Sequence, residues 1–214
     1  NNGTVNGASL TTDRNGTASK AYHFDGVDDH IIALDTGFPA GATPRTISMW
    51  GKSPGKKASE HNHIINYGTH ASSKAFGLIF ADTYGPGLYF YGHGNDLEVY
   101  PGPRAFGDWK HMVATYDGTT LRTYYNGNPA KVQAKALNTV LNQFVMGTAL
   151  ALGPNNSFWG NLDDVRIYNR TLSTSEVTRL YLTEAPAPAI AITSPTPGQQ
   201  LADVNATLGA NITL

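Results

Sequence analysis

Short, mainly apolar stretches that are rich in β-branched and aromatic residues recur along the chain, separated by polar residues that favour turns. In residues 87–92, "GLYFYG", Tyr89 and Tyr91 share one face and Leu88 and Phe90 share the other, as expected of a strand with one buried side. Gly, Pro, Asn and Asp, which favour turns, divide them. The strand-forming stretches cover residues 45–50, 75–81, 87–92, 111–128 and 162–168. The pattern predicts a mostly β protein.

The longest of these stretches contains two turn dipeptides. Asp117-Gly118 and Asn126-Gly127 accept positive φ angles and bracket the segment "TLRTYYNG". This spacing predicts three antiparallel strands connected as a meander.

One segment near the C-terminus has the signature of a helix. Ser173 precedes Glu176 by three residues, which forms a capping box, and Leu172 and Val177 flank it as a hydrophobic staple. We expect one or two helical turns that begin near Thr174.

The sequence changes character after the helix. Residues 184–189 form a Pro/Ala linker, and residues 190–214 have the pattern of opening β-strands. An immunoglobulin-like sandwich takes about 100 residues, so this segment is either part of a truncated second domain or has another use, such as a donor strand.

Composition and charge exclude several classes of protein. The formal net charge is −1, charged residues make up 14% of the chain, and there is no cysteine. These values give no basic surface for nucleic acid, and they exclude disulfides and thiolate sites. No window approaches the roughly 20 apolar residues of a membrane span. Neutral partners such as uncharged glycans are compatible with this balance.

Four blocks of sequence carry a resemblance to a known family. They are, in order, "FDGVDDHI", "TISMW", "DWKHMVATYDGTTLRTYYNG" and "FWGNLDDVRIYNRTLSTSEVTRLY". This order resembles the bacterial laminin-G-like domains. The resemblance implies an all-β, concanavalin A-like jelly-roll sandwich of two antiparallel sheets, with one short C-terminal helix and a short β tail. We expect this domain to cover residues 1–183.

The sequence departs from the family pattern at two places, and its C-terminal segment resembles a second family. Family members usually begin with a further strand, which this sequence lacks, and Trp159 occupies a position that is usually variable and often polar. The ending "AIAITSPTPGQQL" resembles the first strand of a bacterial immunoglobulin-like repeat.

Aspartates in the first and last blocks are candidate metal ligands. Many concanavalin A-like modules hold a structural calcium, and calcium binds six to eight oxygen atoms. The resemblance therefore implies a calcium site at Asp25, Asp28 and Asp163, with Asp29 and Asp164 as further donors. Alternatively, Asp25 forms an Asx turn and Asp163 accepts backbone N–H groups.

Carboxylates for catalysis are scarce. Glycosidases use two carboxylates on the concave face. The chain has only four glutamates, of which Glu176 caps the helix and Glu184 falls in the linker. There is neither a nucleophile elbow nor an E-x-D-x-x-E strand motif. We expect a protein that is not an enzyme, with a jelly-roll glycosidase or lyase as the less favoured reading.

Aromatic residues are the candidate ligand-binding groups. Sugar sites combine aromatic rings with polar side chains that satisfy hydroxyl groups. Trp50 and Trp109 fall in strand blocks and are expected in the core. The candidates for one exposed glycan platform are the unexpected tryptophan, three tyrosines and a histidine: Trp159, Tyr84, Tyr89, Tyr91 and His93.

Together these features predict a non-catalytic carbohydrate-binding or adhesion module of a larger secreted or cell-surface protein. Its expected partner is a glycan or polysaccharide, with no nucleic acid and no membrane insertion. The alternative is a structural surface or filament subunit. In that reading the edge left by the absent first strand accepts a strand from another copy, supplied by the extended tail.

Overall fold

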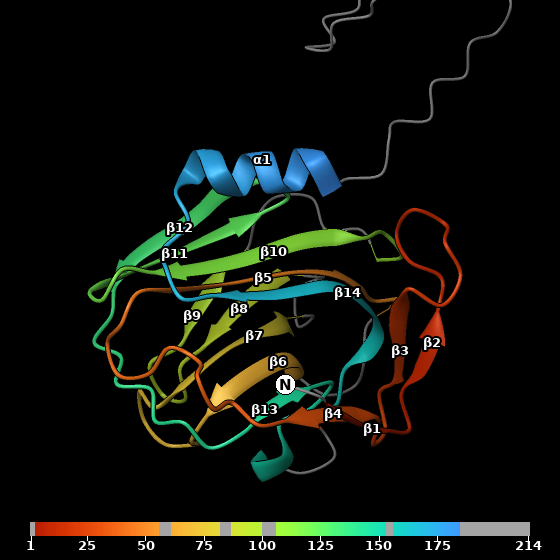
Figure 1. Ribbon diagram of the computed structural model, residues 1–214, viewed down its shortest axis with the longest axis horizontal. Coiled ribbons are helices and arrows are strands. Elements are labelled where there is room, and N and C mark those ends of the chain that lie inside the picture. The colour runs from red at the N-terminus through yellow and green to blue at the C-terminus, as the bar shows by residue number, and fades with distance from the viewer. Residues whose placement is uncertain (1–2, 56–60, 82–86, 100–105, 153–155, 185–214) are drawn as a thin grey trace, which may run out of the picture.

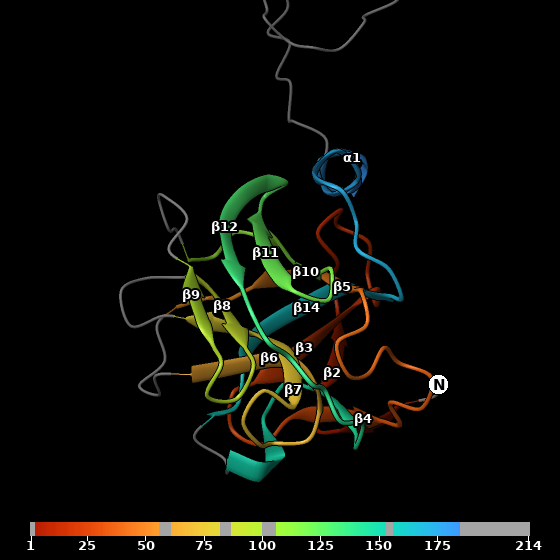
Figure 2. The same cartoon turned by 90° about the vertical axis from the view of Figure 1, so that its left-hand side faces the viewer.

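The computed structural model describes residues 3–55, 61–81, 87–99, 106–152 and 156–184, which form two antiparallel sheets packed face to face (Figures 1 and 2). In spatial order, the first sheet contains β1 (Thr4–Asn6), β4 (His30–Ala33), β13 (Phe144–Met146), β6 (His61–Gly68), β7 (Ala75–Ala81), β8 (Gly87–Tyr91) and β9 (Leu97–Val99). The second contains β12 (Asn128–Ala134), β11 (Thr120–Tyr125), β10 (Lys110–Tyr116), β5 (Arg45–Lys52), β14 (Trp159–Tyr168), β3 (Ala21–Asp25) and β2 (Ser9–Thr11). The predicted fold class is confirmed.

The core fills the space between the two sheets. Alternation along β8 shows how the sequence directs side chains into it, because Leu88 and Phe90 are fully buried while Tyr89 is half-buried on the opposite face. Similar apolar side chains from both sheets form one continuous cluster, among them Phe24, Ile47, Met49, Phe76, Leu78, Phe80, Met112, Phe158 and Leu162.

The predicted meander is present as β10, β11 and β12. Asn126 and Gly127 make the tight turn between β11 and β12, with φ angles of 49° and 74°. At the other turn the Asp117 carboxylate accepts hydrogen bonds from the backbone N–H groups of Thr119 and Thr120. Both turn dipeptides therefore act as the sequence predicts.

The predicted helix is longer than expected. α1 covers Thr174–Glu184, eleven residues, and lies across the outer face of the second sheet (Figure 1). Its capping box is formed, since the Glu176 carboxylate accepts the Ser173 N–H at 2.8 Å. The assignment of Glu184 to the linker is wrong: it is the last helical residue and is 8% exposed. Contacts with the sheet extend the helix beyond what local propensity predicts.

A short 3₁₀ helix, η1 (Leu150–Leu152), lies beside the first sheet. None of the helices in the described ranges is long and apolar enough to cross a membrane. The linker beyond Glu184 and the predicted β tail, residues 185–214, lie outside the described residues.

Candidate functional site

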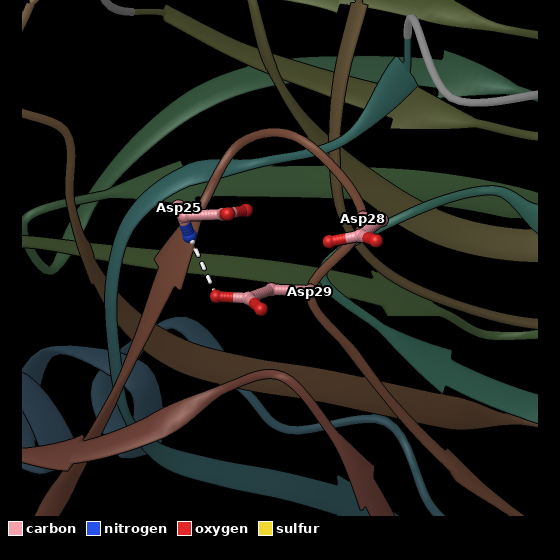
Figure 3. Close-up of side chains that lie close together, drawn as sticks. All are labelled: Asp25, Asp28 and Asp29. Atoms are coloured by element: carbon pink, nitrogen blue, oxygen red, sulfur yellow. Dashed lines mark hydrogen bonds between the residues drawn. The ribbon is translucent and has the colours of Figure 1, made fainter.

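The turn between β3 and β4 brings three carboxylates together. Asp25 ends β3, and Asp28 and Asp29 precede β4. Oxygen atoms from the three side chains lie within 4.8 Å of one another. Figure 3 shows the Asp25 and Asp28 carboxylates pointing toward each other across the turn, with Asp29 beside them. Asp25 and Asp28 are exposed, whereas Asp29 is buried.

Local geometry explains why the turn adopts this shape. The Asp25 carboxylate accepts the Val27 N–H at 2.7 Å, which is the expected Asx turn, and Gly26 supplies a φ of +80°. The Asp29 carboxylate accepts the Asp25 N–H at 2.8 Å. Gly7 packs against Asp29 so closely that a Cβ there would stand 1.9 Å from its Oδ1 atom. The carboxylate is therefore held in place from two sides.

The chemistry of this cluster fits a hard divalent cation. Three carboxylates supply up to six oxygen ligands of the type that calcium prefers. Within the described ranges, no lysine, arginine or histidine forms an ion pair with Asp25, Asp28 or Asp29. Three like charges at this separation repel one another, and a bound cation would offset that repulsion.

Asp163 does not belong to this cluster, which corrects the expected set of metal ligands. In the ladder between β3 and β14, Asp25 pairs with Trp159, so Asp163 lies four positions further along β14. At about 3.3 Å per residue, that separation is about 13 Å. Asp29 takes the third place in the cluster instead.

Asp163 pairs with an arginine near the N-terminus. The Arg14 guanidinium contacts Asp163 at 2.5 Å and Asp164 at 2.6 Å, and the Arg14 and Asp163 side chains are 6% and 7% exposed. Arg14 also donates from Nε to the Glu184 carbonyl oxygen at 2.5 Å. Arg14 therefore links the beginning of the domain to Asp163, Asp164 and Glu184 near its end, and we call this set of contacts the arginine clamp.

Trp159 lies next to the turn between β3 and β4, residues 25–29, which we call the acidic turn. It is the first residue of β14 and pairs directly with Asp25 of β3. Its neighbours Phe158 and Leu162 are buried in the core, so its half-buried side chain points to the outer face of the second sheet. Gly26 packs against its Cβ atom, and the far edge of the ring lies over Gly55. The two glycines leave the indole without a covering side chain at these positions.

The tyrosines of β8 lie on the opposite side of the molecule. Tyr89 and Tyr91 point away from the core on the outer face of the first sheet, because Leu88 and Phe90 point into it. The expected single platform is therefore wrong: Trp159 belongs to the other sheet, with the core between them. Tyr84 lies outside the described residues.

Tyr91 and His93 belong to a hydrogen-bonded group that the sequence did not reveal. The Tyr91 hydroxyl lies 2.9 Å from His70 Nδ1 and 2.7 Å from His93 Nδ1. A phenol has one proton, so at least one imidazole donates its N–H. Burial raises the pKa of Tyr91 well above its usual range, and burial followed by the nearby His93 lowers the pKa of His70. Tyr91 therefore acts as a neutral hub for the two rings.

The sequence places His70 and His93 in nearby loops, but it gives no signal that both rings meet the Tyr91 hydroxyl. Two loops, 69–74 and 92–96, meet because the Ser73 N–H donates to the Gly92 carbonyl at 3.0 Å. That contact brings His70 to His93, 23 residues away in the sequence, and could be found only from the assembled sheet.

A model of the concanavalin A-like lectin/glucanases superfamily, of the laminin G type, matches residues 25–178. The chain belongs to this superfamily. The match begins at the acidic turn and extends into α1, so it includes Asp25, Asp28, Asp29 and Trp159. No curated protein sequence matches the chain.

Solved structures with the same fold are distant in sequence. Domain 4 of AbnA, an extracellular arabinanase of Geobacillus stearothermophilus in complex with arabinotriose, has a TM-score of 0.61 and 19% identity, over 84% of this chain and 87% of that one. The native heptameric SAP-like pentraxin of Limulus polyphemus has a TM-score of 0.59 and 15% identity, over 75% and 81% of the two chains.

A toxin domain is similar at the same level. The botulinum neurotoxin serotype D ligand-binding domain in complex with N-acetylneuraminic acid has a TM-score of 0.63 and 15% identity. The match covers 86% of this chain and 46% of that one, so the chain corresponds to about half of the toxin domain. At these identities the similarity shows the fold alone.

Two of the four glutamates are occupied by structural contacts. Glu176 caps α1, and the Glu184 carboxylate accepts the Trp50 indole N–H at 2.9 Å and pairs with Arg166. Both carboxylates are therefore held by contacts within the protein. Glu60 lies outside the described residues, and Glu98 is an exposed residue of β9.

Proposed function

We propose that this domain is a non-catalytic carbohydrate-binding module that binds neutral glycans at Trp159 and the adjacent acidic turn. The observation that carries the proposal is the direct pairing of Trp159 with Asp25 on the outer face of the second sheet. An indole and a set of carboxylates at one place are the two kinds of group that sugar recognition requires.

Each group has a distinct task in this site. The indole of Trp159 offers a flat apolar surface against which the C–H face of a pyranose or furanose ring can stack. The exposed carboxylates of Asp25 and Asp28 accept hydrogen bonds from sugar hydroxyls, and a charged acceptor strengthens such bonds. A neutral glycan suits these carboxylates better than an acidic one, which they would repel.

Calcium fits the same place. Asp25, Asp28 and Asp29 would hold the ion, and a bound calcium would supply further coordination positions for sugar hydroxyls. The chain's own residues provide the rest of the site: Asp29 is fixed by Gly7 and by the Asp25 N–H, and it orients the turn beside Trp159.

The structural comparisons support a saccharide as the ligand. Two of the similar structures contain a bound saccharide, arabinotriose in one and N-acetylneuraminic acid in the other, and the neutral one of the two, arabinotriose, is of the class proposed here. A module that holds polymeric glycans would operate outside the cell, as part of a secreted or surface protein, and would attach that protein to a polysaccharide.

The test is a glycan array in calcium and then in chelator, with matched variants. Trp159→Ala should abolish retention on the glycan that the unaltered domain binds, whereas Tyr89→Ala on the opposite face should leave it unchanged. The reverse result would move the site to the first sheet. Failure to bind any neutral glycan with calcium present would overturn the proposal.

A separate measurement addresses the metal. Calcium should raise the melting temperature of the domain by several degrees, and Asp29→Asn should remove that rise. Asp108→Asn is the matched control, because Asp108 is an exposed carboxylate whose side chain is 65% accessible. An identical melting temperature in calcium and in chelator would leave the three aspartates as turn formers only.

A further inference from the structure

A row of polar side chains crosses the outer face of the second sheet next to Trp159. His23 of β3, Asn161 of β14 and Lys52 of β5 occupy directly opposed positions on three neighbouring strands, with Asn161 in the middle. We call these three residues the polar row. Neighbouring strands lie about 4.8 Å apart, so the polar row spans about 10 Å across the sheet. Asn161 lies two positions along β14 from Trp159.

The side chains of the polar row point away from the core. Successive residues of a strand alternate between its two faces, and the neighbours of the polar row along each strand, Phe24, Gly51 and Leu162, face the core. All three polar side chains are half-buried, as the Trp159 indole is. The polar row and the indole therefore form one continuous, accessible surface.

One hydrogen bond orders the polar row. His23 Nδ1 lies 2.8 Å from Asn161 Oδ1. An amide oxygen only accepts hydrogen bonds, so Nδ1 carries the proton, and Nε2 of the neutral imidazole is an acceptor. Among the residues that the structure describes, the Asn161 amide nitrogen and the Lys52 ammonium have no partner. The polar row thus presents an acceptor at His23 and donors at Asn161 and Lys52.

The Trp159 indole lies between these donors and the acidic turn. Asp25 pairs with Trp159 on the β3 side of β14. The far edge of the indole lies over Gly55, which follows Lys52 by three residues on the β5 side. A sugar hydroxyl both donates and accepts hydrogen bonds. Carboxylates at one side of the indole and amide and ammonium groups at the other satisfy both properties along one glycan.

The spacing of the two parts exceeds what one sugar ring covers. Two residues along a strand correspond to about 7 Å, which separates Asn161 from Trp159. The bond to His23 holds the Asn161 amide over its own strand position. A ring that stacks on the indole therefore leaves the polar row free for the next ring of a linked chain.

We propose that the polar row is a second subsite, which takes the sugar ring next to the one stacked on Trp159. This inference rests on the proposed function and specifies its ligand as a chain of at least two linked neutral sugars. The Asn161 amide and the Lys52 ammonium donate to oxygen atoms of the second ring, and His23 Nε2 accepts from one of its hydroxyls. The two donors make the site selective for chains over single sugars.

An array of linear neutral oligosaccharides tests this inference in the presence of calcium. It carries the arabinose, glucose, galactose and mannose series, each from one to six units. The unaltered domain should retain chains of two or more units and bind single sugars far more weakly. Asn161→Ala should weaken the retention of chains about fivefold, and Lys52→Met about tenfold because its donor is charged. Neither variant should change the weak binding of single sugars.

Matched variants separate a contact with the glycan from a structural role. Asn161→Asp keeps the oxygen that His23 meets but removes the amide donor, so it should weaken retention as Asn161→Ala does. Asn138→Ala and Lys74→Ala alter exposed loop residues outside both subsites and should leave retention unchanged. Urea denaturation of each variant shows that it is folded.

The outcomes that would overturn this inference can be told apart from failure of the proposed function. Retention that is lost in Trp159→Ala but unchanged in all variants of Asn161 and Lys52 would remove the second subsite and leave the proposed function intact. Single sugars retained as well as chains would have the same meaning. If the unaltered domain retained no neutral oligosaccharide, the proposed function would fall, and this inference with it.

Discussion

Two tryptophans point outward from the same sheet but meet different surroundings. Trp50 on β5 is 2% exposed, because α1 lies over it. Its ring stacks on Tyr181 at 5.6 Å, and its N–H donates to Glu184 at 2.9 Å. Trp159 on β14 lies at the opposite end of the β14–β5 ladder from the helix start and is only half-buried, with Gly26 and Gly55 beside it.

The difference teaches that an outward position on a strand is not the same as an exposed one. Both residues occupy outward positions of a period-two pattern. The helix, which is formed much later in the chain, converts one into a core residue and leaves the other open. The covered tryptophan therefore supports stability, and the open one is available for a ligand.

Removing the covered tryptophan, Trp50, should cause the largest loss of stability. Trp50→Ala should lower the free energy of unfolding by about 4 kcal/mol, because it leaves a large cavity under α1. It also leaves the Glu184 carboxylate, which is 8% exposed, without its indole donor. Urea denaturation measures the loss. A loss below about 1 kcal/mol would show that the helix does not hold this residue as core.

The next largest effect should come from the arginine clamp. Asp163→Ala leaves the side chain of Arg14, which is 6% exposed, without one of its two carboxylates, and should cost about 3 kcal/mol. The rise in melting temperature with calcium should persist in this variant, because Asp163 is not in the acidic turn. If Asp163→Ala abolished the calcium response, the separation of clamp and metal site would be wrong.

Much of the fold could be predicted from the sequence because its signals are local. The strands follow from their β-branched and aromatic residues, the turns from Asp117-Gly118 and Asn126-Gly127, and the helix start from the Ser173 capping box. These features are determined by neighbours a few residues apart. The order of the blocks then led to the superfamily, which the match over residues 25–178 confirms.

The errors concern contacts between distant segments. Asp163 and Arg14 are 149 residues apart, and only the pairing of β14 with β5 and β3 determines which carboxylate the arginine meets. The supposed platform failed for a related reason. Alternation states that Trp159 and Tyr89 both point outward, but not that they do so from different sheets. Sheet membership is a property of the topology, which no local pattern encodes.

A histidine under the helix makes the covered region sensitive to pH. Burial first, and then the charges of Arg14 and Arg166, lower the pKa of His111 from 6.5 to about 4. Between pH 6.5 and about 4, His111 therefore binds a proton in the unfolded state but not in the folded state. Stability falls as the pH is lowered through this window, by about 2–3 kcal/mol, and this group causes no further loss below it.

Urea denaturation of the unaltered chain and of His111→Gln, at several pH values between 7.5 and 4, tests this prediction. The quantity compared is the difference between their free energies of unfolding at each pH. Glutamine can still hydrogen-bond Ser48, which lies 2.9 Å from His111 Nε2, but it does not titrate. The variant should lose less stability on acidification. Parallel curves for the two proteins would rule out His111 as the source of the pH dependence.

Removing the open tryptophan should have the smallest effect on stability and so completes the comparison. Trp159→Ala should cost about 1–2 kcal/mol, because the indole is only half-buried and contacts glycines at Gly26 and Gly55, where no side-chain packing is lost. Glycan retention should be lost in the same variant. A cost close to that of Trp50→Ala would mean that Trp159 is a structural residue, whereas lost binding with a nearly unchanged urea midpoint would assign it to the ligand.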